Sequence, residues 1–292
     1  MTAQDGSHVQ GGLEMAAPSA VSSVEMVRSE IRVGYTLRRA LMRYRRACTL
    51  VSAFVVLLAA WELVARVIGI AAFFPRPGAV GLTLIAMLRS GELVGDMQAS
   101  LARILVGFVV GSALAVPVGL LMGNIRVVRD FCEPYIEFFR YIPALSLVTV
   151  ALIWFGLGEA SKVFLIIYAT MFIVVVNTLA GVKAIPPIKY RAAEALGVHG
   201  WRLFLYVSLP ATVPFILTGM RIAMGNAFAV IVAAEMIGAQ SGLGYRIVYS
   251  RLVMRTDMIF LAIMALGALG FLTDRLFRLL IQAFGSRYNP HW

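Results

Sequence analysis

The stretch RAAEALGVHGWRLFLYVSLP, residues Arg191–Pro210, reads like part of a soluble protein, although apolar runs long enough to cross a bilayer precede and follow it. It carries charged side chains, a histidine and two glycines. About 20 consecutive apolar residues predict a transmembrane helix, because the hydrocarbon core of a membrane is about 30 Å thick. The first question is therefore why a membrane chain keeps this polar segment between two spans, and on which side it lies.

The composition of the whole chain indicates a polytopic membrane protein. Of its 292 residues 60% are hydrophobic and only 14% are charged, whereas soluble domains carry about 25% charged residues. Residues 1–46 contain no apolar run of span length and do not begin like a secretory signal, so we expect a partly disordered cytoplasmic tail there. A transmembrane domain should occupy residues 47–285, followed by a cytoplasmic tail at 286–292.

Six spans can be drawn, and the basic residues between them set the orientation. With the N-terminus inside, the inner segments hold fifteen Lys and Arg residues and the outer segments eight, which agrees with the positive-inside rule. Both termini and Arg191–Pro210 are thus predicted to be cytoplasmic. The net charge of +11 is explained by these flanking residues, so we do not expect a nucleic-acid partner. The predicted spans are Cys48–Ile70, Leu101–Met122, Ile136–Leu157, Val163–Val182, Pro214–Ile237 and Met258–Leu280.

The second span carries a small residue at every fourth position. Four-residue spacing keeps these residues on nearly one helix face, where they let another helix approach closely. Helix packing is the favoured interpretation, and lining of a narrow path is the alternative. The residues are Gly107, Gly111, Ala115, Gly119 and Gly123.

Polar residues within the later spans are candidates for a substrate path. Ser146 and Thr149 share a face just beyond Pro143; they could face a solute or bond back to their own backbone. Arg221 and Glu235 would each be costly against lipid, so each is either a functional group or a buried structural anchor. They lie about 21 Å apart along a helix and cannot pair with each other. The candidate path residues are Pro143, Ser146, Thr149, Arg221, Asn226 and Glu235.

The chain lacks the groups that an enzyme or a metal site needs. None of its three histidines lies in a predicted span or has a carboxylate or cysteine at metal-ligand spacing. It has no Gly-rich phosphate loop, so it should not hydrolyse nucleotide by itself. We therefore expect no catalytic residue, no metal and no cofactor on this chain.

The polar stretch itself predicts a helix, a bend and a second helix. Pro186 and Pro187 stop the fourth span and could begin a new helix. Gly197 and Gly200 loosen the chain, and Pro210 is expected to close a second short helix at the membrane surface. The segment is either an interfacial amphipathic helix or a docking surface for a cytoplasmic partner.

The spacing of this stretch resembles a known signature. Ala192, Ala193 and Gly197, then nine residues and VSLP, resemble the loop E-A-A-x3-G-x9-I-x-L-P of binding-protein-dependent ABC transporter permeases. The runs Ser100–Gly123, Arg140–Val163 and Leu217–Gly238 resemble the nitrate, sulfonate and taurine branch, and the likeness covers about residues 60–285. One departure is Arg191, which stands where the signature has Glu; Glu194 lies one turn further on.

This resemblance implies a fold, partners and a function. The fold would be an all-α integral membrane protein of the type I ABC importer permease kind, with a cytoplasmic coupling loop at about 183–210. An ATPase dimer would bind ATP and Mg²⁺ and dock on this loop, a substrate-binding protein would deliver solute outside, and a second copy would complete a homodimer in the inner membrane. The cargo would be a small anion of the sulfonate, nitrate, bicarbonate or organic acid type. The alternative is a secondary transporter or channel that works without an ATPase, which would show inverted repeats. The residues implied in coupling are Arg191, Ala192, Ala193, Glu194, Gly197, Gly200 and Pro210.

Overall fold

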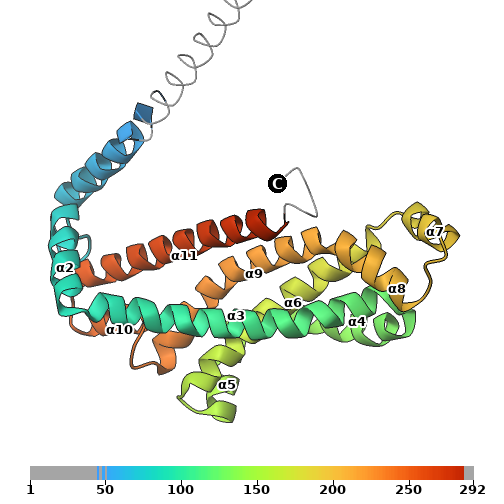
Figure 1. Cartoon of the computed structure of the whole chain (residues 1–292). Helices are drawn as coiled ribbons and strands as arrows, with labels where there is room; N and C mark the ends of the chain where they lie inside the picture. The colour runs from blue at the N-terminus through green and yellow to red at the C-terminus, as the bar shows by residue number, and fades with distance from the viewer. Residues whose placement is uncertain (1–44, 46–47, 50, 286–292) are drawn as a thin grey trace, which may run out of the picture. The chain divides into compact units, whose positions relative to one another are not determined.

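The structure, a computed structural model, describes residues 45, 48, 49 and 51–285 (Figure 1). Apart from Arg45, the two expected tails, 1–46 and 286–292, lie outside the described residues. The chain divides into two units, residues 1–64 and 65–292. The first candidate span is the helix Val51–Ile68. The helices that follow Pro77 all lie in the second unit.

Every regular element described in the second unit is helical. Figure 1 shows α2 and α10 at one end of the long helices and α7 and α8 at the other. The elements are α2 (Pro77–Ser90), α3 (Glu92–Asn124), α4 (Arg126–Arg140), η1 (Ala144–Leu147), α5 (Val148–Phe155), α6 (Glu159–Lys183), α7 (Pro187–Ala195), α8 (Trp201–Leu203), η2 (Phe204–Ser208), α9 (Leu209–Gly238), α10 (Leu243–Leu252) and α11 (Thr256–Gly285).

Small residues on α3 bring this helix into close contact with α6. A Cβ on Gly107 would overlap Ile166 of α6, and one on Gly119 would lie 2.6 Å from the Cβ of Thr178. The same holds for Gly111 against Thr170 and for Gly123 against Val182. Each of these four glycines thus meets the β-branched residue 59 positions later, so α3 and α6 run in the same direction with their backbones close together.

This parallel packing fixes the number of crossings between the two helices. Two helices that cross a membrane in the same direction must be separated by an odd number of crossings. Only the pair α4 and η1–α5 lies between them, so this pair counts as one broken span. Helix α9 runs antiparallel to α6, because Gly219 faces Asn177 whereas Gly181 faces Phe215. Five straight helices and this broken one give six spans in the described residues.

The third span, predicted over Ile136–Leu157, begins earlier in the chain and is broken in two. Its two halves, Arg126–Arg140 and Ala144–Phe155, are bent by 84°. Pro143 causes this break, because proline has no backbone N–H and disfavours helical geometry at the residue before it. The hydroxyl of Tyr168 on α6 donates to the carbonyl of Phe139 at 2.6 Å and to that of Ile142 at 3.3 Å, so hydrogen bonding from α6 supports the bend.

The polar stretch after α6 begins as expected and ends differently. Helix α7 starts at Pro187, and the chain bends at Gly197 and Gly200, whose φ angles are +79° and +59°. The expected stop at Pro210 is wrong: the chain turns through one π-helical segment, η2, and continues as α9 without interruption. In a regular helix the proline ring would clash with the carbonyl four residues earlier. That carbonyl lies within η2, whose wider turn displaces it.

We predict that Gly119→Ala lowers stability whereas Gly95→Ala does not. The new methyl group at position 119 meets the side chain of Thr178 and the carbonyl of Val175, and such overpacking costs about 1–3 kcal/mol. Gly95 lies on the same helix with nothing within 4 Å of an added Cβ, so alanine there should be neutral or stabilise by about 0.5–1 kcal/mol. Thermal unfolding of the detergent-solubilised protein measures both; equal stabilities would contradict the packing described.

Candidate functional site

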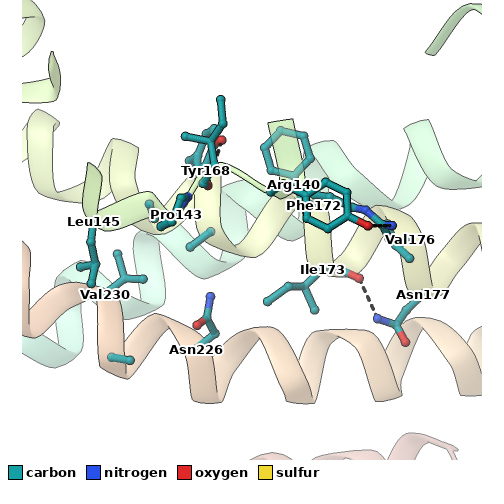
Figure 2. Close-up of a pocket in the computed structure, with 15 residues that line it drawn as sticks. Arg140, Pro143, Leu145, Tyr168, Phe172, Ile173, Val176, Asn177, Asn226 and Val230 are labelled. Atoms are coloured by element: carbon teal, nitrogen blue, oxygen red, sulfur yellow. Dashed lines mark hydrogen bonds between the residues drawn. The ribbon is translucent and has the colours of Figure 1, made fainter. Parts of the chain in front are cut away.

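A cavity of about 660 Å³ lies where the broken span bends. Its walls are residues 140–145 of the bend, one face of α6 and the middle of α9. Figure 2 shows Asn226 pointing from α9 into the space below Pro143 and Tyr168. Binding cavities for small molecules have volumes of about 300–1,000 Å³, so this cavity is large enough for a solute.

A few polar groups are set into the mainly apolar wall of this cavity. Arg140 donates from Nη2 to the hydroxyl of Tyr141 at 2.9 Å, and its guanidinium lies 4.8 Å from the centre of that ring. The amide of Asn177 donates to the carbonyl of Ile173 at 2.8 Å (Figure 2). Phe172 and Val230 supply apolar surface. A permanent cation beside apolar walls suits a small anion, because guanidinium binds carboxylate or oxyanion groups through two donors.

A second cavity, of about 650 Å³, lies between α9 and α11. Arg221 lines it and donates from Nε to Asp274 Oδ1 at 2.7 Å. Arg278 donates to the other oxygen of Asp274 at 2.6 Å. Both arginines are therefore engaged by one carboxylate, and the remaining lining of this cavity is apolar.

A buried ionic cluster closes the opposite end of α9, centred on Glu235, which is 1% exposed. Arg103 of α3 donates from Nη1 to Glu235 Oε1 at 2.6 Å, and Ser100 donates to the same carboxylate at 2.8 Å. The backbone N–H of Gly244 donates to Glu235 Oε2 at 2.9 Å. The carboxylate is thus paired and hydrogen-bonded throughout, as a buried charge must be.

The same cluster fixes the connection between α9 and α10. Arg103 also bonds both oxygens of Glu159 on α6, at 2.5 and 2.9 Å. Asp96 accepts from the backbone N–H of Gly242 at 2.9 Å and from Arg246 at 2.7 Å. Burial alone lowers the pKa of Arg246, but its hydrogen bond to Asp96 and the neighbouring carboxylates raise the pKa above its usual value. Its charge is therefore retained, and α3, α6, α9 and α10 are tied at this end.

Comparisons with known proteins place the chain in a family. Residues 115–286 match the model of the binding-protein-dependent transport system inner membrane component. The chain belongs to this family. It is the membrane-spanning permease subunit of a binding-protein-dependent ABC importer.

Relatives and solved structures agree with this assignment. A protein of Brucella melitensis named as an ABC transporter permease is 44% identical over 70% of this chain and 84% of its own length. The taurine transport system permease TauC of Escherichia coli K12 is 34% identical over 84% of this chain and 90% of its own. The bicarbonate transport system permease CmpB of Synechococcus elongatus is 33% identical over 61% and 64%.

Two solved transporters share the fold of this permease at 18% sequence identity. The MetNI methionine ABC transporter in an inward-facing conformation gives a TM-score of 0.55, over 65% of this chain and 97% of that one. An amino acid ABC transporter gives 0.56, over 70% and 97%. The expected fold, an all-α type I importer permease, is thus confirmed.

The permease distributes the predicted path residues over four places. Pro143 and Asn226 line the cavity at the bend. Ser146 and Thr149 are exposed just beyond it, and Ser146 donates to the carbonyl of Pro143 at 2.7 Å. Arg221 lines the second cavity, and Glu235 is the centre of the ionic cluster. As their spacing requires, Arg221 and Glu235 do not pair with each other.

Sequence reasoning missed Arg140 as a member of the site and Arg103 as the partner of Glu235. Arg140 ends an amphipathic helix three residues before Pro143, and the break at that proline turns its side chain toward α6. Arg103 lies inside a predicted span, where a charge requires a partner. It was used only to predict the orientation of the chain, so its need for a partner was overlooked.

The segment predicted to be the coupling loop is exposed, at the end of the long helices where α7 and α8 lie. Arg191, Ala192, Glu194 and Gly197 are exposed, and Leu196 is 83% exposed although it is apolar. Ser208 in η2 donates to the side-chain oxygen of Asn124 at 2.8 Å. The loop is therefore joined directly to the last residue of α3.

We predict that Arg103→Met destabilises the permease by about 3–5 kcal/mol, the usual cost of leaving one buried charge without its partner. Arg126→Met is the matched control, because the ion pair of Arg126 and Asp130 is 88% and 65% exposed and should contribute at most about 1 kcal/mol. Thermal unfolding in detergent compares the two variants. Equal losses would show that the cluster does not hold the helices together.

Proposed function

We propose that this permease imports a small anion by alternating access, driven by separate ATPase subunits, and that the cavity at the bend is part of the solute path. The observation that carries the proposal is the position of Arg140 at the wall of that cavity. Solute would meet this cation together with the amide of Asn226, which within the described part of the chain has no hydrogen-bond partner. Apolar parts of the solute would contact Phe172 and Val230.

The choice of an anion rests on charge and on the relatives. A fixed guanidinium in a partly apolar cavity favours an anion strongly over a cation of the same size. The names of the relatives point the same way, because taurine carries a sulfonate group and bicarbonate is itself an anion. Sulfonates, bicarbonate, nitrate and small organic acids are thus the class of cargo to test.

Energy would enter through the loop Lys183–Pro210. Its exposed helix α7, its match to the coupling signature and its exposed apolar residues Leu196 and Trp201 support docking in a groove of an ATPase dimer. ATP and Mg²⁺ would bind to those ATPase subunits, which would carry out hydrolysis. Closure of the ATPases would move the packed helices as rigid bodies.

The other partners and the orientation in the membrane are inferred from the family and from the distribution of basic residues. A substrate-binding protein would deliver solute at the outer end, where α2 and α10 lie (Figure 1). Two copies of the permease would face each other across the path. The excess of basic residues in the predicted inner segments supports cytoplasmic termini in the inner membrane.

We predict that Arg140→Met lowers uptake of the transported anion by at least tenfold, whereas Arg126→Met, on the exposed side of the same helix, leaves uptake unchanged. Loss of one charge-assisted contact of about 1.5–3 kcal/mol gives such a factor. Uptake of isotopically labelled taurine, methanesulfonate and bicarbonate by cells that also express the ATPase and the binding protein tests this. Full uptake of the transported anion by Arg140→Met would remove the cavity from the path.

We predict that Gly197→Asp abolishes uptake and co-purification of the ATPase while the permease still inserts. The φ of Gly197 is +79°, where a side chain is strained. Gly91→Asp is the matched control: its φ is +78°, but it lies at the other end of the molecule, between α2 and α3. If both variants lose the ATPase equally, the loss is a folding effect. If Gly197→Asp binds the ATPase and transports normally, the coupling role is wrong, and a carrier or channel independent of an ATPase becomes the better account.

A further inference from the structure

A third, smaller cavity continues from the cavity at the bend toward the inner end of the molecule. It holds about 180 Å³ and lies between α4 and α6. Arg140 and Val176 line both cavities, so the two spaces adjoin. The volume falls from about 660 to about 180 Å³ across this boundary, and the smaller space would hold about six water molecules at 30 Å³ each.

One stripe of α6 forms the wall of both cavities. Tyr168, Phe172 and Val176 face the larger one, and Val176, Ala180 and Lys183 face the smaller one. These residues recur every three or four positions, so they lie on one helix face. The stripe ends at Lys183, the last residue of α6, and α7 begins four residues later at Pro187. A displacement of α7 would thus act on Lys183 through a very short connection.

Helix α4 supplies the opposite wall, with one cation followed by two carboxylates. Arg140 lies at the boundary of the two cavities, Glu137 one turn below it and Glu133 a further turn below. Glu133 accepts from Lys183 Nζ at 3.1 Å, so the narrow end of the smaller cavity is bridged by an ion pair. This pair lies about 10 Å further inward than Arg140, at 1.5 Å per residue.

We propose that the Lys183–Glu133 ion pair is the inner gate of the solute path. Closed, it joins α4 to α6 across the narrow cavity. Its side chains are 46% and 38% exposed, which keeps the pair weak enough to open and close. An anion leaving Arg140 would meet the carboxylates of Glu137 and Glu133, and Lys183 would bind it once Glu133 has moved away. The open gate would therefore let anions pass. Because Lys183 is linked to α7, the ATPase would control when the gate opens. This inference rests on the proposed function of the larger cavity.

The gate can be tested by chemical access to the larger cavity from the inside. The two native cysteines are replaced, Cys48→Ser and Cys132→Ser, and Ile173→Cys places one thiol in the wall of the larger cavity. The permease, assembled with its ATPase, is studied in inside-out vesicles without ATP, using a membrane-impermeant maleimide. Glu133→Gln should speed labelling of Cys at position 173 about fivefold, which corresponds to loss of a pair worth about 1 kcal/mol.

Two further variants separate gating from simple loosening of the helices. They are Lys183→Met and a double variant in which the two charges are exchanged. Lys183→Met should also speed labelling, but uptake of the labelled anion should fall, because two carboxylates then line the exit without a cation. The double variant Glu133→Lys with Lys183→Glu should slow labelling again to near the original rate. Asp130→Asn is the control, because that ion pair lies on α4 outside both cavities and should change neither rate.

The outcomes distinguish the gate from the path. If Glu133→Gln leaves labelling unchanged, or if the charge swap labels as fast as the single variants, the ion pair is not a gate. If the ion pair proves not to be a gate while Arg140→Met still lowers anion uptake, the solute path stands and only the gate is wrong. If Arg140→Met transports normally while labelling responds as predicted, the pair controls access to a cavity that is not the anion path, and the gate as proposed here is overturned.

Discussion

The absence of side chains along one face of α3 is the constraint on which the rest of this permease depends. Gly107, Gly111, Gly119 and Gly123 leave room for the β-branched residues of α6, so two helices that run in the same direction lie in close contact. Because they are parallel, the chain between them must cross once. A single crossing made of α4, a proline break and α5 leaves a bend, and a cavity of about 660 Å³ lies at that bend.

The two ends of this frame are held by different forces. At the end where α10 lies, Arg103, Glu235 and Asp96 form a buried network with few exposed groups, which a small movement would leave with unpaired charges at high cost. At the opposite end, beside α7, the helices are joined by the apolar cluster of Leu120, Val182 and Ile216 and by the half-exposed ion pair of Lys183 with Glu133. The ion pairs are therefore weaker next to α7 than far from it, which suits a molecule that is moved from the α7 end.

Local patterns in the sequence predicted the helices and the exposed loop, but they did not predict the contacts between distant parts of the chain. Span-length apolar runs, the four-residue spacing of glycines and the prolines before α7 act over a few residues and could be read directly. The bend at Pro143 involves a hydrogen bond from Tyr168 of α6, 29 positions after Phe139, which no local pattern predicts. The helix through Pro210 depends on a π turn that has no simple pattern.

The candidate site was predictable to a smaller extent, for the same reason. Pro143 and Asn226 were singled out and do line the cavity, whereas Arg140 was placed there by the bend rather than by its neighbours in sequence. Arg103 and Glu235 are 132 positions apart, and each looked like an isolated charge until the fold brought them together. Charges inside predicted spans are best treated as pairs to be matched.

The central claim is that an ATPase binds the exposed loop between α6 and α9 on the cytoplasmic side of the membrane. The most direct measurement uses a single cysteine at Leu196, which is 83% exposed on that loop, in the assembled transporter. A short reagent that carries a maleimide and a photoreactive group should link this position to the ATPase subunit, and an impermeant maleimide added to intact cells should not label it. Labelling from outside, or the absence of any link to an ATPase that otherwise co-purifies, would contradict the account.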